Sequence, residues 1–150
     1  MANFSFDIKN SRDFFIKLQQ DYDEYNLDKI SSRKALNCTM TAYHLCDWIF
    51  NEYKTEYPEK TKKEYILNQC PSLKIMRDLT NGTKHYQTGS SIKTTDLHKG
   101  VFAMQFSRPF DISTLTIKMK NGQTIYFEDE IKIVFDFWKL YLTENFNIDI

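Results

Sequence analysis

Apolar side chains recur every three or four residues over most of the first half of the chain, which is the spacing of one helix face. The first such stripe consists of Phe14, Leu18, Tyr22 and Tyr25. The same periodicity predicts helices over 11–27, 32–57, 61–68, 71–80 and 129–142. Pro58 is expected to end the second helix and Pro71 to open the fourth, because proline suits the first turn of a helix but not its interior.

The hydrophobic period changes in the second half of the chain. Runs with the period of a strand predict strands over 101–106, 114–119 and 123–128. Asn121-Gly122 lies between the last two runs and predicts a type I′ hairpin turn. Residues 87–97 are rich in turn-forming and β-branched side chains, so the span 80–98 stays open between helix, loop and strand.

These elements predict an α+β fold. A helical bundle carries a small antiparallel sheet, with its hairpin at Asn121-Gly122, inserted before the C-terminal helix. The 150 residues fit one domain, with the β-meander at about 99–128. The composition is 41% hydrophobic and 27% charged, which is typical of a globular protein. The formal net charge is zero, which disfavours a protein that coats DNA without sequence preference.

Several classes of chemistry are disfavoured by what the chain lacks. It has no apolar run near the ~18 residues of a membrane helix. It has no phosphate-binding loop, dinucleotide fingerprint or zinc-protease motif, so we expect no cofactor and no metal. A metal bound by Asp47 with His44 or His85 is the less favoured alternative. The three cysteines form no C-x-x-C pair, and we expect reduced thiols in a cytoplasmic protein.

Positive charge gathers in the middle of the chain. Residues 71–108 contain six Lys or Arg and two Asp, for a net charge of +4. An anionic partner is therefore expected to bind here, with a merely solvated basic face as the alternative.

Asp47 is the unusual residue of the second predicted helix. On a helical wheel it falls inside the apolar arc, between the directions of Leu36 and Met40. A buried carboxylate costs several kcal/mol unless it is paired, so we expect Asp47 to be buried and paired. The expected partners are Lys84, His85, Asn81 or backbone N–H groups. A structural tie between two elements and a polar functional site both remain open.

The segment 71–86 is the main candidate for chemistry. If it is helical throughout, its polar side chains share an arc of roughly 120° at the helical rotation of about 100° per residue. They are Lys74, Arg77, Asp78, Asn81, Lys84 and His85. Asn81-Gly82 is also a good helix end, which would leave Lys84 and His85 on a loop or strand. An exposed basic helix end is the structural alternative.

Several stretches resemble a family of short uncharacterised bacterial proteins. They are 42–48 (AYHLCDW), 70–73 (CPSL), 77–85 (RDLTNGTKH), 100–102 (GVF), 106–108 (FSR), and the hairpin followed by Phe137-Trp138. The resemblance extends from about Ala42 to Leu142. It implies no function, because that family is unassigned.

A more distant resemblance is to the HEPN helical bundles of prokaryotic defence and toxin systems. Their catalytic members are metal-independent ribonucleases with an Arg followed a few residues later by a His. Arg77 and His85 are similar in type, but seven residues stand between them, a wider spacing than the motif's. The resemblance implies a homodimer with two such motifs across one cleft.

We therefore expect a HEPN-like endoribonuclease of a bacterial defence or toxin–antitoxin system. His85 would act as acid and base, and Arg77 and Lys84 would stabilise charge on the phosphorane. Asn81 would orient one of them, and Asp47 would set the tautomer of His85. The alternative is a non-enzymatic module whose patch of Arg77, Lys84 and His85 binds a nucleotide, RNA or an acidic partner protein. Neutral charge and abundant aromatic side chains also favour a homodimer.

Overall fold

The computed structural model describes residues 4–85, 89–98 and 114–150. The described elements are α1 (Ser11–Leu27), α2 (Ser32–Tyr53), α3 (Lys63–Gln69), α4 (Pro71–Lys84), β1 (Ile92–His98), β2 (Thr114–Met119), β3 (Thr124–Tyr126) and α5 (Phe127–Phe146). This confirms the α+β fold with a small antiparallel sheet before the C-terminal helix. The strand expected over 101–106 lies outside the described residues.

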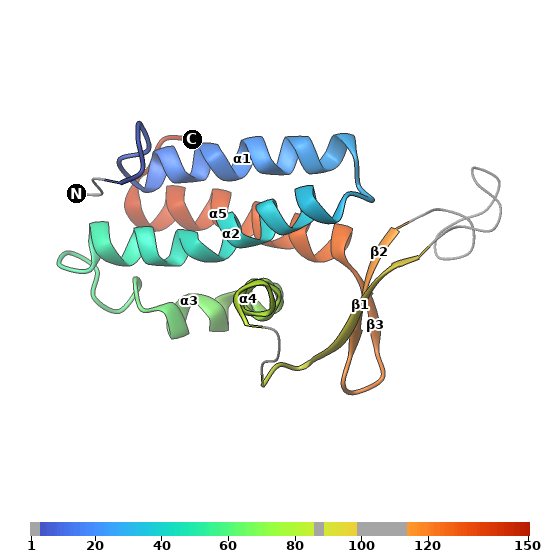
Figure 1. Ribbon diagram of the computed structural model, residues 1–150. Coiled ribbons are helices and arrows are strands. Elements are labelled where there is room, and N and C mark those ends of the chain that lie inside the picture. Colours follow the sequence, from blue (N-terminus) through green and yellow to red (C-terminus); the bar gives the residue numbers. More distant parts are fainter. Residues whose placement is uncertain (1–3, 86–88, 99–113) are drawn as a thin grey trace.

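The long helices α1, α2 and α5 lie alongside one another, and α3 and α4 cover one side of this bundle (Figure 1). The sheet lies at the end of the bundle where α5 begins (Figure 1). Trp138 of α5 is fully buried, and its Nε1–H donates to the Ala42 carbonyl of α2 at 2.9 Å. This bond satisfies the indole N–H inside the core, where an unpaired donor would be costly.

Local capping explains where the first helices begin. The Asn10 side chain accepts a hydrogen bond from the backbone N–H of Asp13 at 2.8 Å, and Ser31 accepts one from Lys34 at 3.3 Å. The second helix ends at Tyr53, earlier than Pro58 led us to expect. Turns fill the interval, in which the Tyr57 N–H still donates to the Tyr53 carbonyl and the Thr61 N–H to the Tyr57 carbonyl.

The strands form a three-stranded antiparallel sheet in the order β1-β2-β3. The β2–β3 hairpin is confirmed, but its turn is not the expected type I′. Of the two turn residues only Gly122 has positive φ, +92°, whereas type I′ requires it of Asn121 as well. The Gly122 N–H donates to the Met119 carbonyl and the Met119 N–H to the Gln123 carbonyl. This is a three-residue loop with glycine in the left-handed position.

The fourth helix continues beyond Asn81-Gly82 and ends at Lys84, past the expected boundary near residue 80. Gly82 does not take a positive φ, and the His85 N–H donates to the Asn81 carbonyl at 2.8 Å. The Thr83 hydroxyl lies 3.7 Å from the Met40 sulfur of α2. This packing of the last turn against α2 explains why the glycine does not end the helix.

The last helix runs from Phe127 to Phe146, beyond both ends of the predicted range 129–142. Its first turn contains three acidic side chains, which interact favourably with the positive end of the helix dipole: Glu128, Asp129 and Glu130. Asn147 takes the left-handed conformation that ends it. Among the helices of the described ranges, not one has the length and apolar character needed to span a bilayer.

Candidate functional site: the groove between α4 and the sheet

The polar face of α4 is continuous because the helix reaches Lys84. Arg77, Asn81 and Lys84 are spaced i, i+4 and i+7, so they share one stripe. His85 follows in extended conformation as the C-cap and is exposed. Eight steps of ~1.5 Å put Arg77 and His85 about 12 Å apart along the helix axis. The stripe can therefore contact successive charges of an extended anion better than one phosphate group.

Asp78, next to this stripe, is the buried carboxylate of the region. Its side chain is only 8% exposed. One carboxylate oxygen accepts from Nε of Arg77 at 2.9 Å, and the other accepts from the Ser91 hydroxyl at 3.2 Å. The pairing links α4 to the residue that precedes β1, so Asp78 positions the sheet against the helix.

Asp47 is not the buried residue that its wheel position predicted. Its side chain is 47% exposed. It is paired, but with Lys63 of α3 at 2.8 Å and with Nδ1 of His44 at 3.3 Å. These partners replace the expected Lys84, His85 and Asn81. The reason is that α3, rather than α4, lies against this part of α2, and α3 leaves the carboxylate open to water.

Asp47 and α4 also line different hollows. Asp47 and Trp48 line a depression with Lys9 and Asn10 of the N-terminal segment. The hollow beside α4 contains Asp78, Gly82 and Thr83 instead. The structure thus keeps Arg77, Asn81 and Lys84 on one helix with His85 as its C-cap, but none of the four lines the hollow beside α4. The contacts of Asp47 come from α2 and α3 instead.

A β-bulge brings a lysine toward α4. The β1–β2 register shifts between Ile92 and Thr94, so Lys93 is the extra residue of β1. A bulge re-aims the side chain at the extra position. Lys93 accordingly lines the hollow beside α4 together with Lys120, whose backbone N–H donates to the Ser91 carbonyl at 2.8 Å.

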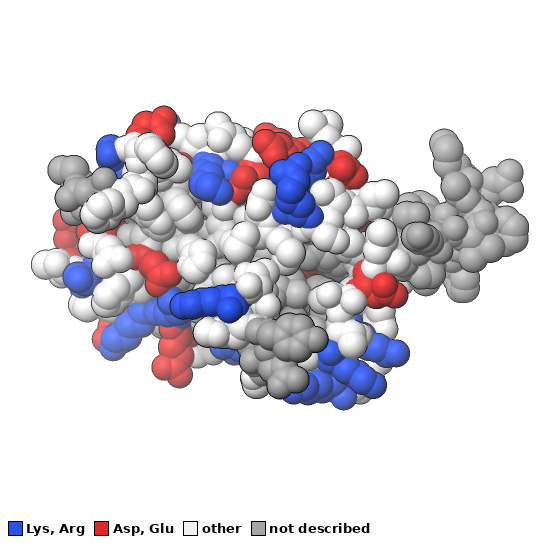
Figure 2. Space-filling view, in the orientation of Figure 1, with Lys and Arg blue, Asp and Glu red and all other residues white. Residues whose placement is uncertain are grey.

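This hollow, which we call the α4–sheet groove, has a volume of about 880 Å³. The lining residues from α4 are Asp78, Leu79, Gly82 and Thr83, and those from the sheet side are Ser90, Ile92, Lys93, Thr95 and Lys120, with Leu36 from α2. Figure 2 shows Lys and Arg side chains gathered at the hairpin end of the sheet. Within the described residues no carboxylate pairs with Lys84, Lys93, Lys118 or Lys120. These cations are thus available to a ligand.

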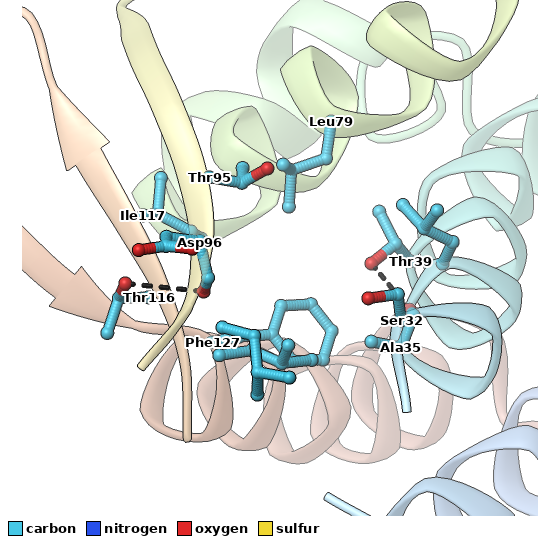
Figure 3. A pocket seen from close by; sticks show the side chains of 12 residues that line it. Ser32, Ala35, Thr39, Leu79, Thr95, Asp96, Thr116, Ile117 and Phe127 are labelled. Atoms are coloured by element: carbon cyan, nitrogen blue, oxygen red, sulfur yellow. Dashed lines mark hydrogen bonds between the residues drawn. The ribbon is translucent and has the colours of Figure 1, made fainter. Parts of the chain in front are cut away.

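A second, smaller pocket of about 240 Å³ lies between α2, the sheet and the start of α5. In Figure 3 Leu79 and Thr95 lie on one side of it, Phe127 lies opposite, and Ser32 and Thr39 face the strands. Its lining is mainly apolar. Leu36, Leu79 and Thr95 line both this pocket and the α4–sheet groove. The two hollows are therefore neighbours that share a wall.

The cysteines are poor candidates for chemistry. Cys38, Cys46 and Cys70 are all buried and free. Burial raises the pKa of the Cys46 thiol to about 12 and also raises the pKa of Cys38 and Cys70. A protonated thiol is a weak nucleophile. In the part of the chain that is described, no three His, Cys, Asp or Glu side chains cluster as metal ligands.

Sequence reasoning missed the lysines of the sheet. Lys118 alternates with Ile117 and Met119 in a period-two run that continues to Lys120, so the solvent-facing positions of this strand were readable. The position of Lys93 could not be predicted, because the sequence did not assign its segment to a strand and a bulge has no clear sequence pattern. Asp78 was placed on the polar arc, and its burial depends on Ser91, which is distant in sequence.

Comparisons with known proteins add no identity, since no family model, no curated protein and no solved structure matches the chain.

Proposed function

We propose that the protein binds single-stranded RNA in the α4–sheet groove. The observation that carries this proposal is the bulge at Lys93, which brings this lysine into one groove with Lys120 and α4. Lys84, exposed in the last turn of α4, adds a further positive charge on the helix. Lysines that follow the backbone of a single strand contribute much of the affinity for it. Among the described residues no carboxylate pairs with Lys93 or Lys120, and Asp78, which also lines the groove, is held by Arg77 and Ser91.

Binding is tested with a labelled RNA oligomer at several salt concentrations. Replacing both groove lysines, K93Q with K120Q, is expected to weaken binding by about tenfold or more and to reduce the salt dependence by the equivalent of one or two phosphate contacts. The control double variant, K62Q with K132Q, removes the same charge from two exposed lysines, the N-cap residue of α3 and a residue of α5. It should bind like the wild-type protein. Equal losses in both double variants would contradict a defined site.

Ribonuclease activity is the second candidate function. It is favoured by the alignment of Arg77, Asn81 and Lys84 on one stripe that ends at the exposed His85. In such a reaction His85 would accept the 2′-hydroxyl proton, and Lys84 would stabilise the phosphorane charge. Asp47 has no part in this version, since its partners are His44 and Lys63. A role as a HEPN-like toxin or defence nuclease depends on this candidate.

The test of cleavage is incubation of RNA with the purified protein and a chelator. Wild-type protein should shorten the RNA, and the double variant R77A with H85A should not. RNA that binds but stays intact would leave a non-enzymatic RNA-binding module. Binding of an acidic partner protein in place of RNA would contradict the main proposal.

We also propose that the chain forms a homodimer. Ile133 is 50% exposed and Leu140 is 61% exposed, seven positions apart on the outer face of α5. An apolar stripe of this kind is typical of a helix that contacts another protein. Light scattering at high concentration should give twice the mass of the 150-residue chain, and I133E should give a monomer.

A further inference from the structure

The apolar pocket next to the α4–sheet groove has no role in the proposal above. Three residues, Leu36, Leu79 and Thr95, line both this pocket and the cationic groove. A ligand lying across this shared wall would meet lysine ammonium groups at one end and apolar side chains at the other. The cleft as a whole therefore suits a molecule with an anionic head and a flat, weakly polar body.

The polar atoms of the pocket narrow the class of ligand. Ser32 and Thr39 of α2 face the strands (Figure 3). The Thr39 hydroxyl donates to the Ala35 carbonyl, so its oxygen remains able to accept. A purely aliphatic body would leave these hydroxyl oxygens without a donor to accept from. A heteroaromatic ring with N–H groups can instead contact Leu79 or Phe127 with its face and the oxygens with its edge.

We propose that this cleft binds one unpaired nucleotide, with its base in the apolar pocket and its phosphate between Lys93 and Lys120. The volume of about 240 Å³ bounds the pocket to a single ring system rather than to a stretch of bases. This inference rests on the proposed RNA binding and adds that the site distinguishes RNA with bases from a bare backbone. The nucleotide can come from an RNA strand or from a free nucleoside monophosphate.

The variant that tests the proposal blocks the shared wall. Thr95 lies in an exposed strand position and lines both hollows, so T95W should place an indole ring at their shared wall, and the strand should tolerate this ring. Its neighbour Thr94 points to the opposite face of the sheet, because side chains alternate along a strand. T94W is therefore the matched control, with the same added ring outside the cleft.

The experiment compares a short RNA with an abasic oligomer of the same length, for each of the three proteins. Wild-type protein and T94W should bind the RNA about tenfold more tightly than the abasic strand, as expected for one stacked base. T95W should bind both strands equally, at the wild-type affinity for the abasic one. Urea unfolding of T95W with the midpoint of T94W shows that the variant is folded.

The outcomes separate this inference from the proposed function. Wild-type protein that binds both strands equally overturns the base pocket but keeps RNA binding in the groove. Binding of neither strand overturns both. A preference for RNA that persists in T95W also overturns the pocket. Competition with adenosine or uridine monophosphate identifies the source: displacement at concentrations below those of inorganic phosphate supports a free nucleotide, and displacement by oligomers alone supports a strand.

Discussion

Two aspartates of the bundle differ, in opposite directions, from the exposure that their helical-wheel positions predict. Asp47 lies on the apolar arc of α2, yet it is half-exposed and paired with Lys63 and His44. Asp78 lies on the polar arc of α4, yet it is 8% exposed and held by Arg77 and Ser91. The helical wheel gives the direction of a side chain correctly, but burial depends on which element packs there. The short helix α3 leaves Asp47 open to water, whereas Ser91, in the segment that leads into β1, contacts Asp78.

This difference predicts that removing the two carboxylates lowers the free energy of unfolding by unequal amounts. The larger loss is expected for D78A. This variant leaves the Arg77 guanidinium and the Ser91 hydroxyl without their buried acceptor, so we expect a loss of about 2–3 kcal/mol in the free energy of unfolding. Urea denaturation measures it. D78N is the matched control, because an amide keeps an acceptor for Ser91 and should lose less. A wild-type stability for D78A would show that the carboxylate is not structurally important.

A smaller effect is expected for S91A. The variant removes one hydrogen bond from the buried carboxylate and keeps its ion pair with Arg77, so unfolding should become easier by about 1 kcal/mol. S90A, measured in the same way, is a comparison that removes a different hydrogen bond, from the Ile92 N–H to the Ser90 hydroxyl at 2.9 Å, and leaves Asp78 untouched. If D78A and S91A are combined, the losses should not add, because both remove the same contact.

D47A is expected to cost less than about 1 kcal/mol, since exposed ion pairs contribute little and are screened by salt. The comparison with D78A becomes sharper at 1 M salt, where the cost of D47A should vanish and that of D78A should persist. Unfolding curves at low and high salt measure both. A cost for D47A as large as that for D78A would contradict the exposed position of Asp47.

The smallest expected effect is the pH dependence of the stability that the pair of Lys63 and Asp47 contributes, which appears only in alkaline solution. Partial burial lowers the pKa of Lys63, but the hydrogen bond and charge of Asp47 outweigh it, so the pKa is raised above its usual value. The stability from this pair is complete below about pH 10.4, the usual lysine pKa, and is lost as pH rises through the raised value. Arg77 stays charged throughout.

The wild-type protein and D47A should therefore converge in stability at strongly alkaline pH, while D78A remains less stable than both. The comparison must be made between variants, because the buried Cys46 and Tyr141, with pKa values raised to about 12, lower the stability of every variant as the unfolded chain deprotonates. A gap between wild type and D47A that stays constant with pH would contradict the role of Lys63.

Sequence patterns predicted the helices and the hairpin better than they predicted which of these elements contact one another. The periodic stripes placed all five helices of the described ranges, and Asn121-Gly122 placed the hairpin, because these signals are local. The end of α4 was misplaced because Thr83 packs on Met40, a contact between distant residues. The groove was hardly foreseen. Of its α4 residues only Asp78 belonged to the predicted polar arc, and Arg77, Asn81, Lys84 and His85 do not line it. Lys93 depends on a bulge in a segment that the sequence left open among helix, loop and strand.

Intrinsic fluorescence can follow these two environments separately, because the two tryptophans lie in different parts of the molecule. Trp138 is fully buried, with its indole hydrogen bonded inside the core. Trp48 is half-buried, stacks on Phe14 with ring centroids 4.8 Å apart, and lines the same depression as Asp47. Both tryptophans of the sequence thus lie outside the α4–sheet groove. In the Trp48→Phe variant, tryptophan fluorescence comes from Trp138 alone and reports on the core. The difference between the wild-type spectrum and that of the variant reports on the surface around Asp47.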